Sequence, residues 1–275
     1  MFMEIFVGSI TLLLVVFVVC MLLYFIFGRI IEPAYILVFN KPVYVHFYPF
    51  RKELPFEEKE ILEKNFGFYR NLSDRRKKFF CHRISTFIEN YKFVGREGLE
   101  VTEDMKVKIA ASAVMLTFGM REYLPELFEV IIIYPEIFES RNGDYHKGEF
   151  NPAARAVVFS WKDFQEGIDF ESDNINLGLH EFAHVLHLNA TAIKRLGSSF
   201  AIYSDMFNKI REYVSIPYNR DKIMNAGYLR EYAFTNQHEF IAVALEYFFE
   251  TPLEFRQRLP ELYYMIRHMI NFREG

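Results

Sequence analysis

The first 27 residues of the chain have a different pattern of apolar and polar positions from the rest. Ile5 to Phe27 is a run of 23 residues without a charged side chain. At 1.5 Å per residue, a helix of this length crosses a hydrocarbon core of about 30 Å. The run therefore predicts one transmembrane helix. A cleaved signal peptide is the alternative, but a basic start, a shorter apolar stretch and a small-residue cleavage site are not evident.

The charges beside the apolar run predict its orientation. Glu4 is the only charged residue before the run, whereas Arg29, Lys41, Arg51 and Lys52 follow it. Because segments rich in Lys and Arg stay on the cytoplasmic side, the C-terminal part is expected to face the cytoplasm.

Prolines separate the apolar run from the remaining chain. Tyr35 to Phe50 alternates loosely in β-prone residues between Pro33, Pro42 and Pro49, which is typical of a short extended connector. We therefore expect three parts: an anchor over residues 1–28, a connector over 29–53 and a globular domain over 54–275.

From Leu54 onward the apolar positions mostly follow helical spacing. Residues 79, 80, 84 and 87 are apolar at three-to-four spacing, and Lys92–Gly95 is expected to close that helix. Thr102 is a cap signal for the next helix, whose residues 109–115 have the composition of a buried core helix.

Two short runs interrupt the helical pattern. Phe128 to Tyr134 and Ala156 to Trp161 are rich in Val, Ile and aromatic residues and predict strands of a small sheet. From Asn174 to the end the pattern is helical again, apart from expected loops near residues 197, 217 and 227. The expected fold class is α+β, mostly helical with a small sheet.

Composition narrows the classes of function. With 51% hydrophobic residues, a net charge of −4 and a pI near 6.1, the chain has a sizeable core and lacks the basic excess of a nucleic-acid binder. Cys20 lies inside the apolar run and Cys81 far from it, so no disulfide framework is expected. Cys81 followed by His82 has no metal-ligand spacing.

The strongest chemical signal is the sequence His180-Glu181-Phe182-Ala183-His184. Residues four apart on a helix lie on one face, so His180 and His184 can bind one zinc ion. Glu181 is rotated by about 100° from His180 and can reach a metal-bound water without being a ligand. The motif predicts a zinc-dependent hydrolase with Glu181 as general base, on a helix that begins at Asp173 or Asn174.

His187 shares the face of the two histidines. It lies seven residues beyond His180, about 10 Å along the helix, which is too far for both to bind one ion. We therefore expect a structural or supporting role for His187.

The third ligand is expected on a later helix. Glu239 is the best candidate, near the start of an apolar helix from Asn236 to Glu250. The alternative is that Asn236 caps this helix and Glu239 is its capping-box partner. Glu246 lies two turns further along the same face and could orient a histidine.

The residues also resemble the Mlc titration factor A family of bacterial zinc peptidases, from about Leu54 to Arg267. The matching blocks are Lys92–Gly95, Gly98–Leu99, Thr102–Met105, Ile109–Ala111, Val158–Trp161, His180–His184, Glu239–Phe240 and Glu246–Glu250. The resemblance implies a soluble, zincin-like peptidase core with one zinc ion held by His180, His184 and Glu239. Together with the apolar run, a bacterial family predicts a location at the inner membrane.

That family is similar to the catalytic domain of anthrax lethal factor, in which a tyrosine seven residues before the glutamate ligand faces the reacting carbonyl. Tyr232 has this position, and its hydroxyl would stabilise an oxyanion; Tyr228 is the competitor. Two features depart from the family: the membrane anchor, and His187 where an aspartate is expected.

The resulting hypothesis is a membrane-anchored peptidase that hydrolyses peptide bonds through a zinc-activated water. An extended substrate would pair with an edge strand that contains Val158, Phe159 and Ser160, although an ordinary core strand fits equally well. The second hypothesis, which follows from the family name, is a metal-binding protein that sequesters a transcriptional repressor with little peptidase activity.

Overall fold

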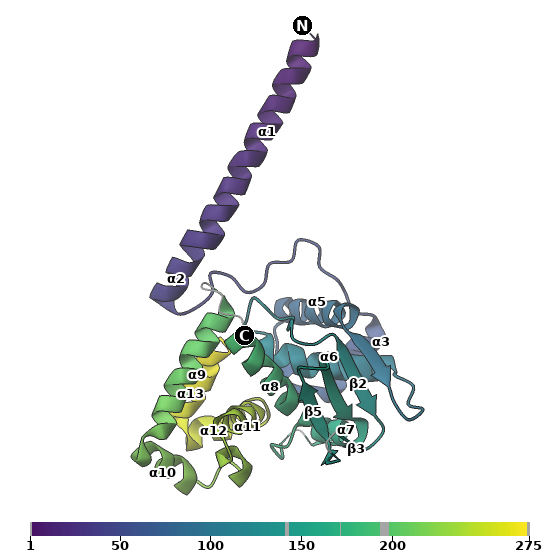
Figure 1. The fold of residues 1–275 in the computed structure, drawn as a ribbon, viewed down its shortest axis with the longest axis vertical. Coiled ribbons are helices and arrows are strands. Elements are labelled where there is room, and N and C mark those ends of the chain that lie inside the picture. The colour runs from purple at the N-terminus through teal and green to yellow at the C-terminus, as the bar shows by residue number, and fades with distance from the viewer. Residues whose placement is uncertain (1, 141–142, 171, 193–197, 274–275) are drawn as a thin grey trace.

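The computed structural model describes residues 2–140, 143–170, 172–192 and 198–273. The N-terminal apolar run is one long helix that projects away from a globular domain (Figure 1). It consists of α1 (Phe2–Ile26), a π-helical turn η1 (Phe27–Ile31) and α2 (Glu32–Phe39). By length and composition this helix can cross a membrane, and its most apolar stretch is not buried by the domain.

The expectation of an extended connector from Tyr35 was wrong at its start. Helix α2 continues to Phe39 and ends where Asn40 adopts a left-handed backbone conformation with φ of 47°. Pro33 does not break the helix, because it lies in the first turn of α2, directly after the wide π-helical turn.

A mixed four-stranded sheet forms one layer of the domain. Its strands, in spatial order, are β1 (Lys92–Gly95), β2 (Val130–Tyr134), β6 (Ala156–Ser160) and β5 (Gly148–Asn151). The first three strands are parallel, and β5 is antiparallel to β6 at the edge. The two predicted strands are confirmed. Lys92–Gly95 does not end a helix, since it pairs with β2, a partner that local sequence cannot indicate.

The expected edge position of Val158, Phe159 and Ser160 was wrong. These residues lie in β6, which pairs with β2 on one side and β5 on the other, so its backbone is already hydrogen-bonded. All five residues of β6 are buried. The free edge on this side of the sheet belongs to β5.

Helices cover the sheet and build most of the domain (Figure 1). They are α3 (Phe56–Asn65), α4 (Gly67–Arg70), α5 (Asp74–Asn90), α6 (Glu103–Thr117), α7 (Trp161–Asp169), α8 (Leu177–Ala192), α9 (Ser199–Ser215), α10 (Pro217–Asn225), η2 (Glu231–Phe234), α11 (Gln237–Glu250), α12 (Pro252–Arg258) and α13 (Pro260–Met269). A two-stranded ribbon pairs β3 (Phe138–Glu139) with β4 (Tyr145–His146).

The centre of the domain is the buried helix α6, which packs against α5 and α8. Helix α8 in turn packs against α11, so the two helices that carry the predicted ligands are neighbours. The loop expected near Gly197 lies outside the described residues. Pro217 begins helix α10, and Gly227 makes a turn with φ of +58°. The predicted α+β class, mostly helical with a small sheet, is confirmed.

Candidate metal centre

The motif helix begins three residues later than expected. Asn174 has φ of +59°, which is incompatible with a right-handed helix, and α8 starts at Leu177. Asn176 caps it, because its Oδ1 accepts a hydrogen bond from the backbone N–H of Leu179 at 2.9 Å. Ile175 is therefore outside the helix and exposed, whereas Leu179, Phe182 and Leu186 are buried.

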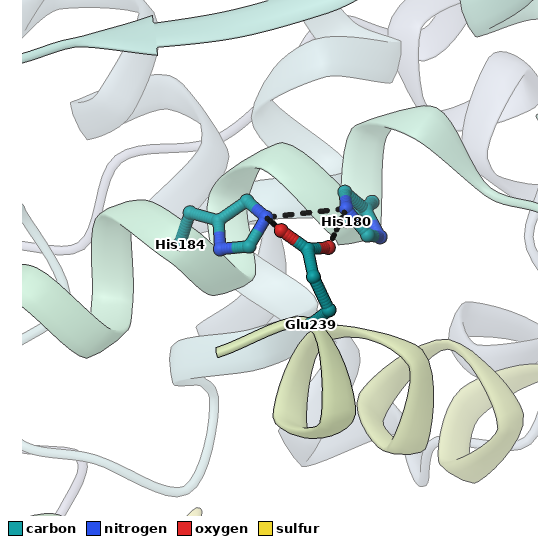
Figure 2. Close-up of side chains that lie close together, drawn as sticks. All are labelled: His180, His184 and Glu239. Carbon is teal, nitrogen blue, oxygen red and sulfur yellow. Dashed lines mark hydrogen bonds and ion pairs between the residues drawn. The ribbon is translucent and has the colours of Figure 1, made fainter. Parts of the chain in front are cut away.

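The structure brings His180, His184 and Glu239 together between α8 and α11 (Figure 2). Nε2 of His180 lies 3.1 Å from Nε2 of His184 and 3.0 Å from Oε2 of Glu239. Nε2 of His184 lies 3.5 Å from Oε1 of Glu239. These separations are close to the distance of about 3.4 Å between ligands that bind one tetrahedral zinc ion.

Asn236 caps α11, as the alternative interpretation required. Its Oδ1 accepts hydrogen bonds from the backbone N–H groups of His238 and Glu239, at 2.8 and 3.1 Å. The carboxylate of Glu239, however, points to the histidines (Figure 2). Asn236 therefore caps the helix through the backbone of Glu239, and the side chain of Glu239 remains available to bind a metal ion.

The donor set suits a zinc ion. Two imidazole nitrogens and one carboxylate oxygen are the ligands of a catalytic zinc site that keeps a fourth position open. Oε2 of Glu239 is buried and makes no well-oriented hydrogen bond to any of the described residues. A buried carboxylate oxygen without such a bond is costly, and a bound cation would remove that cost.

The charges of the group also favour a cation. Burial lowers the pKa of His180, but its pairs with Glu239 and Glu246 outweigh this effect and raise it to about 9. Burial and the neighbouring His180 lower the pKa of His184 to about 4. Burial raises the pKa of Glu239, but the histidines outweigh it and leave that pKa below its ordinary value. The carboxylate is thus ionised, His184 is neutral, and His180 is protonated without a metal ion, so a cation that binds here replaces the proton on Nε2 of His180.

Glu246 orients His180. Its Oε1 lies 2.8 Å from Nδ1 of His180, so Nδ1 can donate its hydrogen and leave the Nε2 lone pair free for a metal. The same carboxylate accepts hydrogen bonds from Arg230 at 2.6 and 3.1 Å and from the backbone N–H of Asn176 at 2.8 Å. The role suggested for Glu246 by its spacing agrees with this geometry. Arg230 was missed, because no spacing rule relates a loop residue to Glu246.

Glu181 lies against strand β5, close enough to His180 and Glu239 for their charges to act on it. It is 7% exposed and accepts a hydrogen bond from the backbone N–H of Phe150. Burial raises the pKa of Glu181 to about 7, and the charge of Glu239 adds to this despite the opposing effect of His180. A carboxyl group with such a pKa can both accept and return a proton near neutral pH.

Gly148 of β5 allows this close approach. A β-carbon at this position would lie 2.7 Å from Cγ of Glu181 and 2.8 Å from its Oε1. Sequence reasoning overlooked β5, although a glycine next to a strand often marks a close backbone contact.

Of the two candidate tyrosines, Tyr232 is the one that lies beside His180 and Glu239. Its hydroxyl donates a hydrogen bond to Glu239, and its ring centroid lies 6.0 Å from that of His180. Half of Tyr232 is exposed, so the ring lies at the open side of the group. The hydroxyl of Tyr228 instead bonds to Thr251 at 2.6 Å, which directs it away from the centre.

His187 lies apart from the three-residue group. It is buried, and its ring packs 4.4 Å from Phe207 and 4.7 Å from His238, between centroids. Its Nδ1 lies 3.5 Å from the hydroxyl of Tyr203. These contacts fit the structural role expected for His187.

One cavity among the described residues lies apart from this group. It has a volume of about 710 Å³, and its lining includes Asn176, Leu179, Phe249 and Glu250 but none of His180, His184 and Glu239. The candidate metal site is therefore identified by its three converging side chains and not by a cavity.

Comparisons with known proteins agree with this geometry. The model of the family described as glucose-regulated metallo-peptidase M90 matches residues 49–271. The chain is 24% identical over 235 residues to Uncharacterized protein slr2042 of Synechocystis, which covers 79% of this chain and 84% of that protein. It is 24% identical to Mlc titration factor A of Klebsiella pneumoniae (72% and 80% covered) and 27% identical to that of Salmonella arizonae (70% and 82%).

Proposed function

Because the chain belongs to the glucose-regulated metallo-peptidase M90 family, we propose that it is a membrane-anchored zinc peptidase. The observation that carries this proposal is the convergence of His180, His184 and Glu239 from two helices on one point. The resemblance to the Mlc titration factor A family, inferred from the sequence blocks, is confirmed.

His180, His184 and Glu239 would hold the zinc, with one ion per chain. When bound, zinc supplies a Lewis acid that makes a coordinated water acidic near neutral pH and polarises a carbonyl. Glu246 keeps His180 in the tautomer that offers Nε2.

The remaining chemistry belongs to Glu181 and Tyr232. Glu181 accepts a proton from the attacking water and passes it to the leaving amine, as its pKa near 7 allows. The phenol of Tyr232 is displaced from Glu239 and donates a hydrogen bond to the carbonyl oxygen as negative charge develops there.

An extended peptide would reach this centre along β5. That strand is the edge of the sheet, and its residue Phe150 already contacts the catalytic carboxylate. Strand β6, which contains Val158, Phe159 and Ser160, would then hydrogen-bond to β5 as its partner strand and would not bind substrate directly.

The location follows from the N-terminal helix. Residues 5–27 would cross the inner membrane of a bacterium, and Arg29, Lys41, Arg51 and Lys52 would keep the domain in the cytoplasm. Under this proposal the anchor comprises residues 1–28, the connector 29–53 and the peptidase domain 54–275.

Metal content tests the proposal first. The full chain in detergent, freed of loosely bound metal, should hold about one zinc ion, and His184→Ala should hold little. The parent should then cleave unstructured peptides, and Glu181→Gln should keep the metal but lose activity. A folded parent that binds no zinc, even when zinc is added, would contradict the assignment.

A second candidate function rests on the relatives named Mlc titration factor A, whose sequences the chain covers to about 80%. The domain would then bind a transcriptional repressor at the membrane. A chain that retains metal, hydrolyses no peptide and binds such a repressor would favour this candidate.

A further inference from the structure

The last part of the long N-terminal helix packs against the globular domain. Glu32 and Ile36 of α2 are buried, at 3% and 5% exposed. The carboxylate of Glu32 pairs with Arg121, which also binds Glu122 at 3.1 Å. The helix is therefore fixed to the domain from Glu32 onward.

This attachment limits the distance between the domain and a membrane. The uncharged run ends at Phe27, and the five residues from there to Glu32 span about 8 Å of helix. The headgroup layer on each side of a bilayer is about 5–8 Å thick. The domain therefore begins within the headgroup layer or at its aqueous surface. Little water can separate the membrane from the face of the domain beside the helix.

The connector that follows α2 occupies this face. It runs over α5 and forms the crest of the domain on the side from which α1 projects (Figure 1). Its position is fixed by Arg83, which is fully buried and donates hydrogen bonds to Tyr48 Oη at 2.6 Å and to the carbonyl of Val45 at 3.3 Å. The same guanidinium binds the carbonyls of Thr117 and Met120 in the core, at 2.7 and 2.6 Å.

Large apolar side chains nevertheless point outward from the connector. Phe50 is 92% exposed and Phe47 is 72% exposed, although aromatic side chains are usually well buried. Arg51 follows Phe50 directly, and Lys41 adds a second cation at the start of the connector, where it lies over the ring of Phe39. Aromatic residues and cations together are typical of surfaces that lie in the headgroup layer of anionic membranes.

We infer that the connector face, residues 41–51, inserts into the headgroup layer of the bilayer that α1 crosses. Phe47 and Phe50 lie on the acyl-chain side of the phosphates, and Lys41 and Arg51 bind the phosphates of anionic lipids. This contact rests on the proposed anchor and adds to it, because a domain held by both helix and connector face keeps its metal centre at one height and tilt above the membrane.

Lipid quenching of a single tryptophan tests the contact. The full chain with Trp161→Phe receives either Phe50→Trp or Tyr218→Trp and is reconstituted in phosphatidylcholine–phosphatidylglycerol vesicles with bromine near the headgroup end of the acyl chains. Tyr218 is the matched control, since it is 77% exposed on α10, at the far end of the domain from α1 (Figure 1).

We expect the brominated lipid to remove most of the emission of Phe50→Trp and little of that of Tyr218→Trp. Equal quenching of the two variants, in a chain that resists carbonate extraction, would overturn the contact and leave the anchor intact. If carbonate releases the unsubstituted chain from the vesicles, the anchor is overturned, and the contact with it.

Discussion

Replacing Glu246 by Gln tests how the metal centre is supported. Glu246 is 1% exposed, and its carboxylate binds His180 Nδ1, both terminal nitrogens of Arg230 and the backbone N–H of Asn176. Glutamine keeps the shape of the side chain, but it removes the charge and turns one acceptor into a donor. Arg230 then loses its anionic partner, and His180 loses the acceptor that sets its tautomer.

The magnitudes follow from these contacts. Loss of a supporting carboxylate typically weakens metal affinity about 10- to 100-fold. Breaking a buried ion pair costs about 3–5 kcal/mol, and the lower end applies because a quarter of the Arg230 side chain is exposed. For a domain of this size, about 3 kcal/mol corresponds to a fall in Tm of about 6–12 °C.

Chelator competition on the full chain in detergent measures the metal affinity, and near-UV circular dichroism of the metal-free chain measures the Tm. Glu250→Gln is the matched control. Glu250 lies one turn further on α11 and also binds the loop before α8, but burial raises its pKa to about 8, so its carboxyl group is mostly neutral at pH 7. If Glu246→Gln and Glu250→Gln have the same metal affinity, the support assigned to Glu246 is refuted.

Three further predictions concern single residues. Tyr232→Phe should retain metal and lower kcat about 100-fold with little change in KM, because the phenol acts on the oxyanion; steady-state kinetics within twofold of the parent would exclude that role. Gly148→Ala should lower peptide cleavage and leave zinc content unchanged, since the new β-carbon would lie 2.7 Å from Cγ of Glu181; an active variant would show that β5 does not position Glu181. The raised pKa of Glu250 stabilises the fold at low pH, and this contribution is lost as pH rises from about 4.5 through about 8, so Glu250→Gln should gain Tm relative to the parent over that range. A constant Tm difference across the range would contradict the pKa shift.

The sequence by itself determined the features that depend on local spacing. The uncharged run of residues 5–27 requires only its own composition to predict a long apolar helix. His180 and His184 share a helix face because they are four residues apart, and Glu239 could be placed on a second helix with Asn236 as its cap. The two strands rich in Val and Ile were found for the same reason.

Tertiary structure decided everything that depends on a distant partner. Lys92–Gly95 is a strand only because β2 lies beside it, and Val158–Ser160 is internal only because β5 covers its other side. The choice between cap partner and ligand for Glu239 depended on where α11 packs against α8, and the link from Arg230 to Glu246 joins a loop to a buried helix face. Side-chain spacing is a property of one element, whereas these contacts depend on how separate elements pack, and no local pattern encodes that.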